Sequence, residues 1–302
     1  MNQTYAIYKI HAKIDAMSKF LDLDKYIRGE KNSLDQIRSY YKTNHWAYRH
    51  FHSHEGFMHF RVSPGGFVRE EDCYYQPNRV AEYIKPNSTV LELGFGQGAN
   101  LLYLAHSFPD VKFYGIDLLP RKDMEIPDNV TIFKQDYSSF PQIEDNSLDV
   151  VYAFETTVHN SDKEKIFREV CRALKPGGVF IVYEYALTAE YETFEPYLQK
   201  AISLISKGAA SPLVESVDAF NRHFVNSGFT IENFRDYTEE VLPDLKRLEH
   251  EAARCLERPW LARIIFAVCP TQFVTNAFLG YLAYDSGKAG AMVYDEWVLR
   301  KP

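Results

Sequence analysis

The sequence is poor in cysteine, has no excess of basic residues and contains no long apolar run. Its cysteines, Cys73, Cys171, Cys255 and Cys269, are scattered along 302 residues without a paired spacing. Such a distribution fits neither a disulfide framework nor a tetrahedral zinc site. We therefore expect reduced thiols and no metal bound by cysteine.

Basic and acidic residues are nearly balanced, with 34 of the first kind against 41 of the second and a net charge of −7. No overall basic field is available to attract nucleic acid or an acidic membrane surface. The first residues, MNQTYAIYKIHAKIDAM, lack the long apolar core of a secretory signal, and no stretch approaches the roughly 20 apolar residues of a spanning helix. We expect a cytoplasmic protein with no nucleic-acid partner and no integral membrane segment.

Hydrophobic residues make up 46% of the chain, enough for one large α/β domain with an appendage. Residues 1–82 have helical periodicity followed by an aromatic and histidine-rich segment, and we expect an N-terminal helical cap and lid there. From residue 89 on, short β-branched runs alternate with helical ones. This alternation predicts a mostly parallel sheet covered by helices on both faces, with strands in TVLELGF, KFYGIDL, VTIFKQD, LDVVYAFE and VFIVYEYA.

Two further strands are expected near the end of the chain, in FTIENFRDY and MVYDEWVLRK. Between them lies a helical stretch, about 240–285, that a sheet of this size does not need. We interpret it as a lid or an interface inserted into a main domain of residues 83–302. A homodimer is compatible with that interpretation.

The stretch LELGFGQG places Gly94, Gly96 and Gly98 after a predicted strand and before a predicted helix. Such a turn lets a ligand approach the main chain. A dinucleotide site has the pattern G-x-G-x-x-G/A, but here the sixth position is Asn100. Glu92 would also repel a pyrophosphate, whereas it could hold a cationic or hydroxylated group. We therefore expect a ligand other than a dinucleotide.

Two more acids follow the next strands. Asp117 ends the second strand, where an acid about 20 residues beyond the glycines accepts both ribose hydroxyls. Asp136 ends the third strand and is followed by Tyr137. This pair can accept a hydrogen bond from an adenine amino group and cover the ring with an aromatic surface.

Four motifs, ELGFGQG, GID, QDYSSFP and LKPGG, together resemble those of the class I S-adenosylmethionine-dependent methyltransferases. The resemblance implies an α/β, Rossmann-like, seven-stranded, mostly parallel sheet with the cap and the helical insertion added to it. It also implies S-adenosyl-L-methionine as the cofactor. The cofactor-binding residues would be Glu92, Gly94, Gly96, Gly98, Asp117, Leu118, Asp136, Tyr137 and Phe154.

A longer segment, VYAFETTVHNSDKEKIFREVCRALKPGG, resembles the sterol (C-24) methyltransferase group, which reads E-A-T-x-H after the fourth strand; Glu155, Thr157 and His159 match. The group's tyrosine-rich segment ending in F-H-F has a counterpart in SYYKTNHWAYRHFHSHEGFMHF, with His59 and Phe60. The closing strand AYDSGKAGAMVYDEWVLRKP is also similar to that of the group. The departures from the pattern are Thr156, Val158 and Gly56, the last of which stands where serine is common.

This second resemblance implies C-methylation of an alkene in a small, apolar isoprenoid or sterol-like substrate. Methylation of an alkene leaves a carbocation, which aromatic faces stabilise and a carboxylate or imidazole deprotonates. The catalytic candidates are Glu155, His159, Tyr41 and His59, with Glu155 the first candidate for the base.

Two other hypotheses remain open at this stage. An N- or O-methyltransferase of a small amine or phenol would use His159 as general base, and YEYALTAEYETFE at 183–195 could cage a cation. A protein without activity would keep the cofactor fold for binding or assembly through residues 240–285.

Clustered histidines and arginines suggest further ligands. His52 and His54 could chelate a metal in an extended segment, but no pattern completes a site among His45, His50, His52, His54 and His59, so we expect no metal. Several arginines on one face would bind a diphosphate; otherwise they are solvated surface residues: Arg38, Arg49, Arg61, Arg69 and Arg79.

Overall fold

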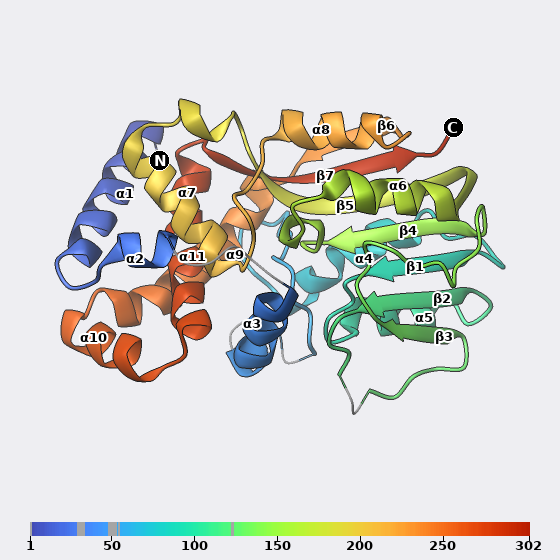
Figure 1. The fold of residues 1–302 in the computed structure, drawn as a ribbon, viewed down its shortest axis with the longest axis horizontal. Coiled ribbons are helices and arrows are strands. Elements are labelled where there is room, and N and C mark those ends of the chain that lie inside the picture. Colours follow the sequence, from blue (N-terminus) through green and yellow to red (C-terminus); the bar gives the residue numbers. More distant parts are fainter. Residues whose placement is uncertain (1, 29–33, 48–52, 54, 122–123) are drawn as a thin grey trace.

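The protein forms a seven-stranded sheet with helices on both faces and a large helical region beyond one end of it (Figure 1). The structure, a computed structural model, describes residues 2–28, 34–47, 53, 55–121 and 124–302, with the main chain alone for 45–47. The strand order is β3-β2-β1-β4-β5-β7-β6. The strands are β1 (Thr89–Leu93), β2 (Lys112–Asp117), β3 (Val130–Lys134), β4 (Leu148–Phe154), β5 (Leu174–Leu187), β6 (Thr230–Asp236) and β7 (Met292–Arg300).

Strands β1 to β5 are parallel, whereas β7 runs antiparallel between β5 and β6. This confirms the predicted Rossmann-like, mostly parallel sheet. The strand order turns back between β1 and β4, and such a point opens a crevice at the carboxyl ends of the strands. The glycine turn follows β1 at this position.

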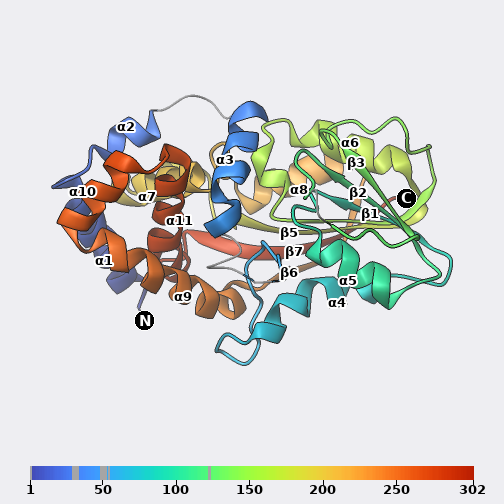
Figure 2. The ribbon, with the colours of Figure 1, turned by 90° about the horizontal axis from the view of Figure 1, so that it is seen from below.

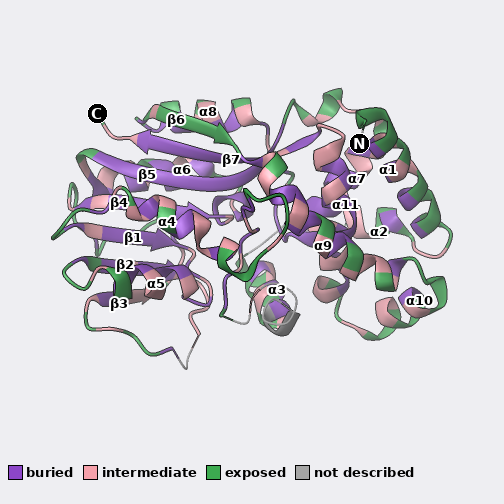
Figure 3. Ribbon diagram, turned by 180° about the vertical axis from the view of Figure 1, so that it is seen from behind, coloured by how far each residue is buried: buried purple, intermediate pink, exposed green. Residues whose placement is uncertain are grey.

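Apolar residues of the central strands are buried on both sides of the sheet (Figure 3). On one face they pack against α6 (Lys163–Ala173) and α8 (Val217–Asn226). On the other face they pack against α5 (Ala99–Ser107), α4 (Tyr75–Ala81) and α9 (Thr238–Leu256). The near-continuous apolar runs of the sequence arise from this two-sided burial.

The N-terminal helices and the helical insertion, far apart in sequence, pack together beyond the strand ends (Figure 1). Lys13 of the first helix lies between Glu249 and Asp285 of the insertion, with its Nζ at 2.5 and 2.6 Å from their carboxylate oxygens. The proposed division at residue 82 therefore separates segments that share one helical layer. The helices of this layer are α1 (Gln3–Ser18), α2 (Leu23–Ile27), α3 (Leu34–Ala47), α7 (Pro196–Gly208), α9, α10 (Pro259–Val268) and α11 (Thr271–Lys288).

Helix α3 lies on the side of this helical layer that faces the sheet (Figure 2). Its residue Tyr41 reaches the loop after β4, where it contacts His159. That loop contains the short 3-10 helix η3 (Thr157–His159). The two others are η2 (Glu70–Tyr74) and η4 (Tyr191–Thr193).

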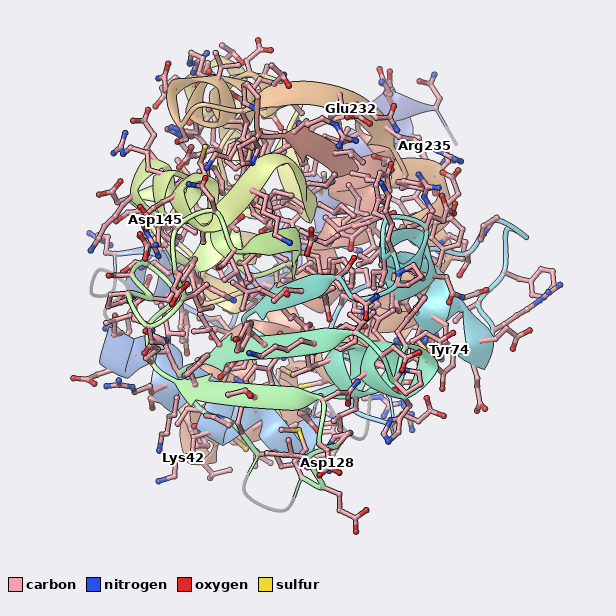
Figure 4. The ribbon with its side chains drawn as sticks, turned by 90° about the vertical axis from the view of Figure 1, so that its right-hand side faces the viewer. Lys42, Tyr74, Asp128, Asp145, Glu232 and Arg235 are labelled. Carbon is pink, nitrogen blue, oxygen red and sulfur yellow. The ribbon has the colours of Figure 1, made fainter. Side chains whose placement is uncertain are left out.

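The edge strand β6 carries charged side chains, among them Glu232 and Arg235 at the surface in Figure 4. Arg300 of β7 pairs with Glu232. Charges on an edge strand discourage pairing with a further strand. Among the described residues, none of the helices has both the length and the apolar character needed to cross a membrane.

Candidate active site

One cavity of about 930 Å³ lies where the carboxyl ends of the strands meet α3, α11 and the segment 56–60. Its lining includes all the predicted catalytic residues and all the predicted cofactor-binding residues except Gly98. The residues brought together in its lining are Tyr41, His59, Glu92, Gly94, Gly96, Asp117, Leu118, Asp136, Tyr137, Phe154, Glu155 and His159.

The glycine turn after β1 needs glycine for its conformation and for packing. Gly94, Gly96 and Gly98 all have positive φ, at 67°, 54° and 87°. A Cβ on Gly94 would meet Thr156 Cγ2 at 2.3 Å, and one on Gly98 would meet Met124 Sδ at 2.3 Å. Gly98 precedes α5 and lies outside the cavity lining, so it shapes the turn and the helix start rather than lining the predicted cofactor site.

Asp117 is held at the end of β2 by the main chain around it. Its Oδ2 accepts a hydrogen bond from the Gly96 N–H at 2.8 Å, and its Oδ1 accepts one from the Leu119 N–H at 2.6 Å. Burial raises the pKa of this carboxyl, and the two main-chain donors oppose that effect. Each oxygen keeps a second lone pair for a ligand hydroxyl.

Asp136 and Tyr137 follow β3 on the same side of the cavity. The Asp136 Oδ1 accepts a hydrogen bond from the Ser138 N–H at 2.8 Å. The buried Tyr137 donates its hydroxyl to the Thr156 carbonyl at 2.8 Å, which fixes the ring. The pair therefore offers an acid and a fixed aromatic side chain in the lining, as the adenine hypothesis requires.

Glu92, Asn100 and His59 form a buried chain of hydrogen bonds. Glu92 accepts from the Tyr152 hydroxyl at 2.9 Å and from the Asn100 amide at 3.5 Å. Asn100 Oδ1 lies 3.1 Å from His59 Nε2 and the Phe60 carbonyl lies 3.1 Å from His59 Nδ1, so the neutral ring can donate to one of these two acceptors. Burial raises the pKa of Glu92 to about 8, so this carboxyl is protonated at neutral pH.

Glu155 is a partly buried acid in a strained main-chain conformation, with φ of +50°. Its Oε1 accepts hydrogen bonds from the Phe60 N–H at 2.6 Å and from the Tyr294 hydroxyl at 2.9 Å. Burial raises its pKa to about 8, against the effect of these donors. Strain of this kind costs about 1–3 kcal/mol and is concentrated at functional sites.

His159 is buried beside Tyr41. Its Nδ1 lies 3.3 Å from the Ala210 carbonyl, which can only accept, so Nδ1 carries the proton. Nε2 then accepts from the Tyr41 hydroxyl at 2.5 Å. Burial lowers the pKa of His159 to about 4, which makes the ring neutral at physiological pH.

The segment 56–60 covers the glycine turn. A Cβ on Gly96 would meet Met58 Sδ at 2.8 Å, so Met58 rests on the turn. Tyr40, in the aromatic segment expected to form a lid, is buried, donates its hydroxyl to Asn276 at 3.3 Å and is not part of the cavity lining. The side chain of Trp46, in the same segment, lies outside the described residues.

The histidine hypothesis is not tested, because His50, His52 and His54 lie outside the described residues. Among the residues that are described, no group of three or more His, Cys, Asp or Glu could hold a metal. The arginine hypothesis finds less support, since Arg38 is the one of its four described arginines that belongs to the cavity lining. Arg38, Arg61, Arg69 and Arg79 form ion pairs with four separate carboxylates, at 3.1, 3.5, 3.9 and 3.4 Å. Arg49 is not described.

Comparison with known proteins identifies the architecture around this cavity. Residues 91–182, which carry the glycine turn and the acids after the strands, match the methyltransferase domain family. The chain carries a methyltransferase domain. Its sequence resembles the sterol 24-C-methyltransferases of Yarrowia lipolytica, at 33% identity over 175 residues, and Schizosaccharomyces pombe, at 33% over 177 residues.

These alignments cover 53% and 54% of this chain and 43% and 45% of the relatives, so the matched region spans less than half of their length. Solved structures share the fold. The [4+2]-cyclase SpnF matches with a TM-score of 0.67 and 16% identity, over 91% of this chain and 98% of SpnF. A geranyl diphosphate methyltransferase matches with a TM-score of 0.60 and 16% identity, over 81% of this chain and 89% of that protein.

S-adenosylmethionine, the cofactor of this class of domain, fits the residues of the methyltransferase domain. Acids lie near the end of β1 just before the glycine turn, at the end of β2 and just after β3, where hydroxyl and amino groups of the cofactor need acceptors. The turn 92–100 contains no basic residue that would neutralise a phosphate. The sequence pattern does not indicate Gln97, Met58, Tyr294 or Gln76. Tyr294 donates to Glu155, and Gln76 donates to Tyr294 and to the Phe60 carbonyl, from parts of the chain that are distant in sequence.

Proposed function

We propose that the protein is an S-adenosylmethionine-dependent methyltransferase that methylates an alkene carbon of a small isoprenoid or sterol-like substrate. The observation that carries this proposal is Glu155, a partly buried carboxyl in the cavity lining whose pKa is raised to about 8. Aromatic side chains in the same lining, Phe60, Phe154 and Tyr185, suit an apolar acceptor and a cationic intermediate.

When bound, S-adenosylmethionine would supply an electrophilic methyl group: the alkene carbon would form the new carbon–carbon bond in line as the S–CH3 bond breaks and S-adenosylhomocysteine leaves. The rings of Phe60, Phe154 and Tyr185 then stabilise the tertiary cation that remains on the substrate. The ionised form of Glu155 accepts the proton that this cation loses, and because burial raises the pKa of this acid to about 8, that form becomes more populated as the pH rises toward 8. Both of its hydrogen-bond donors bind Oε1, which leaves Oε2 to take the proton.

Methylation of an amine finds less support. In segment 183–195, Tyr185 alone belongs to the cavity lining. Tyr183 donates to Glu296, and the Glu184 carboxylate is held by the Thr157 hydroxyl and the Val158 N–H. A cation cage from this segment is therefore not available.

O-methylation of a phenol is the second candidate, because the neutral His159 ring accepts a hydrogen bond from the Tyr41 hydroxyl. A phenol taking the place of that hydroxyl would be activated as a nucleophile.

An N-methyltransferase is also among the relatives: phosphoethanolamine N-methyltransferase 1 of Arabidopsis thaliana is 29% identical over 204 residues, 62% of this chain and 36% of that protein.

The direct test is incubation of the purified protein with methyl-labelled S-adenosylmethionine and a matched panel of isoprenoid alkenes, phenols and amines. We expect label in an isoprenoid product and none in the saturated analogue of the same substrate, which lacks the nucleophile. Label confined to a phenol or an amine would overturn C-methylation while leaving methyl transfer in place.

A further inference from the structure

Gln97 lies in the glycine turn, between Gly96 and Gly98, and belongs to the cavity lining. Its side chain is 5% exposed. Both amide atoms, Nε2 and Oε1, are buried and have no hydrogen-bond partner among the residues that the structure describes. Buried side-chain amides are normally paired, so an unpaired donor and acceptor in a cavity wall point to a ligand.

Neighbouring polar groups already have partners. Glu92 is bonded to Tyr152 and Asn100, and the Gly96 N–H is bonded to Asp117. The Gln97 amide thus brings an unused donor and an unused acceptor to the wall of the cofactor end of the cavity.

Gly56 provides the space for this amide. Its φ is +95°, and a Cβ built on it would lie 3.1 Å from Gln97 Cβ and 3.2 Å from Gln97 Oε1. A serine at position 56, common in the sterol methyltransferase group, would therefore crowd the Gln97 side chain. Glycine at 56 and glutamine at 97 therefore fit one another. The segment 56–60, which covers the turn, shields the amide from water.

We propose that Gln97 binds the amino-acid end of S-adenosylmethionine, with Nε2 donating to the carboxylate and Oε1 accepting from the ammonium group. An amide offers one donor group and one acceptor, which suits a zwitterion better than an adenine or a ribose alone. The ribose and the adenine are assigned to Asp117 and to Asp136 with Tyr137, which leaves the turn above β1 for the amino-acid end. This assignment rests on the proposed function only in taking S-adenosylmethionine as the cofactor. It does not depend on which substrate accepts the methyl group.

Titration calorimetry on the full chain tests the proposal with two ligands. S-adenosylhomocysteine has the amino-acid end, and 5′-methylthioadenosine keeps the nucleoside but lacks that end. Gln97→Met, which keeps the length of the side chain and removes both polar atoms, should weaken S-adenosylhomocysteine by about tenfold or more, because charge-assisted hydrogen bonds are lost. Its affinity for 5′-methylthioadenosine should stay within about twofold.

A second variant separates the two halves of the contact. Gln97→Glu keeps the shape but places a carboxylate against the carboxylate of the ligand, so S-adenosylhomocysteine should bind more weakly. Decarboxylated S-adenosylmethionine, which keeps only the ammonium group, should bind as well as before or better. Gln142→Met is the matched control, since Gln142 is exposed and outside the cavity lining, and it should change neither affinity.

Equal losses for S-adenosylhomocysteine and 5′-methylthioadenosine, or no loss for either, would overturn the role of Gln97. Thermal unfolding without ligand provides a further check: Gln97→Met should unfold no earlier than the parent protein, because it removes an unpaired buried amide. If the parent protein binds neither ligand, the proposed function itself fails. If it binds both and the variants bind equally well, the inference alone fails.

Discussion

The Phe60 N–H donates a hydrogen bond of 2.6 Å to Oε1 of Glu155, so the lid segment and the acid after β4 are joined directly. Phe60 also belongs to the segment that covers the glycine turn, next to His59 and its contact with Asn100. A displacement of this segment would remove a donor from Glu155 and would also expose the carboxyl to water, which lowers its pKa because burial is the main cause of the raised value. Closure of the lid and the readiness of the acid to accept a proton are therefore coupled.

Glu155→Gln should lower kcat by a factor on the order of 10² to 10⁴, because the variant keeps the shape and loses the proton acceptor. Cofactor affinity should stay nearly intact. In the parent protein, turnover should rise with pH toward about 8, the value to which burial raises the pKa of Glu155. Steady-state kinetics and calorimetry on the same preparations check both parts.

His159→Gln is the comparison for that variant. For an alkene acceptor, loss of the His159 ring should reduce turnover less than loss of the Glu155 charge does. The opposite order would favour the phenol hypothesis, in which the ring accepts the proton.

Asp117→Ala should weaken S-adenosylmethionine by about tenfold or more, since hydrogen bonds to a charged group contribute roughly 1.5–3 kcal/mol each. The control is Asp110→Ala, because Asp110 is exposed and outside the cavity lining. Unchanged binding by the Asp117 variant would refute the placement of the ribose.

Binding of the cationic cofactor should release a proton from Glu92. Burial raises the pKa of this carboxyl to about 8. A cation bound beside it would favour the charged form and lower that pKa. Affinity should therefore increase as the pH rises from about 6 to about 8 and then level off. Glu92→Gln should lose this slope, and calorimetry in buffers of different ionisation enthalpy should detect the released proton only in the parent protein.

The lid, expected to include Tyr40, Tyr41, Trp46, His59 and Phe60, should be protected by the cofactor. Limited proteolysis within residues 39–65 should become slower when S-adenosylhomocysteine is added, since a closed site excludes water and protease alike. Equal cleavage rates with and without the ligand would count against closure.

Asp295 should lower stability at neutral and alkaline pH. Both of its carboxylate oxygens are buried without a partner among the described residues, and burial raises its pKa to about 8. The unfolded chain releases this proton near pH ~4. From there up to about pH 8 the unfolded state binds fewer protons than the folded state, so the free energy of unfolding decreases as the pH rises.

Asp295→Asn removes that titration. The variant should therefore be more stable than the parent protein at about pH 8 by roughly 1 kcal/mol or more, with a smaller difference near pH 5. Denaturant unfolding at the two pH values measures this. Asp128→Asn, at the surface in Figure 4, is the control and should show no such change.

The sequence predicted those site residues whose position in space follows from the order of the strands along the chain. Glu92, Asp117 and Asp136 lie near the ends of successive parallel strands, so topology alone brings them into one cavity. Glu155 follows the fourth strand for the same reason. The alternation of apolar runs likewise predicted the sheet and the position of the helical insertion.

Contacts between distant segments were not predictable in this way. Tyr294 reaches Glu155 from the last strand, across 139 positions, and Lys13 joins the first helix to an insertion more than 230 positions away. Neither contact leaves a periodic or spaced pattern. Gln97 lies inside the motif LELGFGQG. Its proposed role depends on its packing against Gly56 and on an amide without a partner among the described residues, and both are relationships in space that the sequence does not show.

The central claim is that a carbon atom of an isoprenoid alkene receives the methyl group in this cavity. Carbon-13 NMR of the product formed from S-adenosylmethionine with a ¹³C-methyl group tests it most directly. We predict a methyl resonance with the shift and proton coupling of a methyl attached to carbon, and its loss in the Glu155→Gln variant. A methyl attached to oxygen or nitrogen, or a normal yield from that variant, would contradict the account.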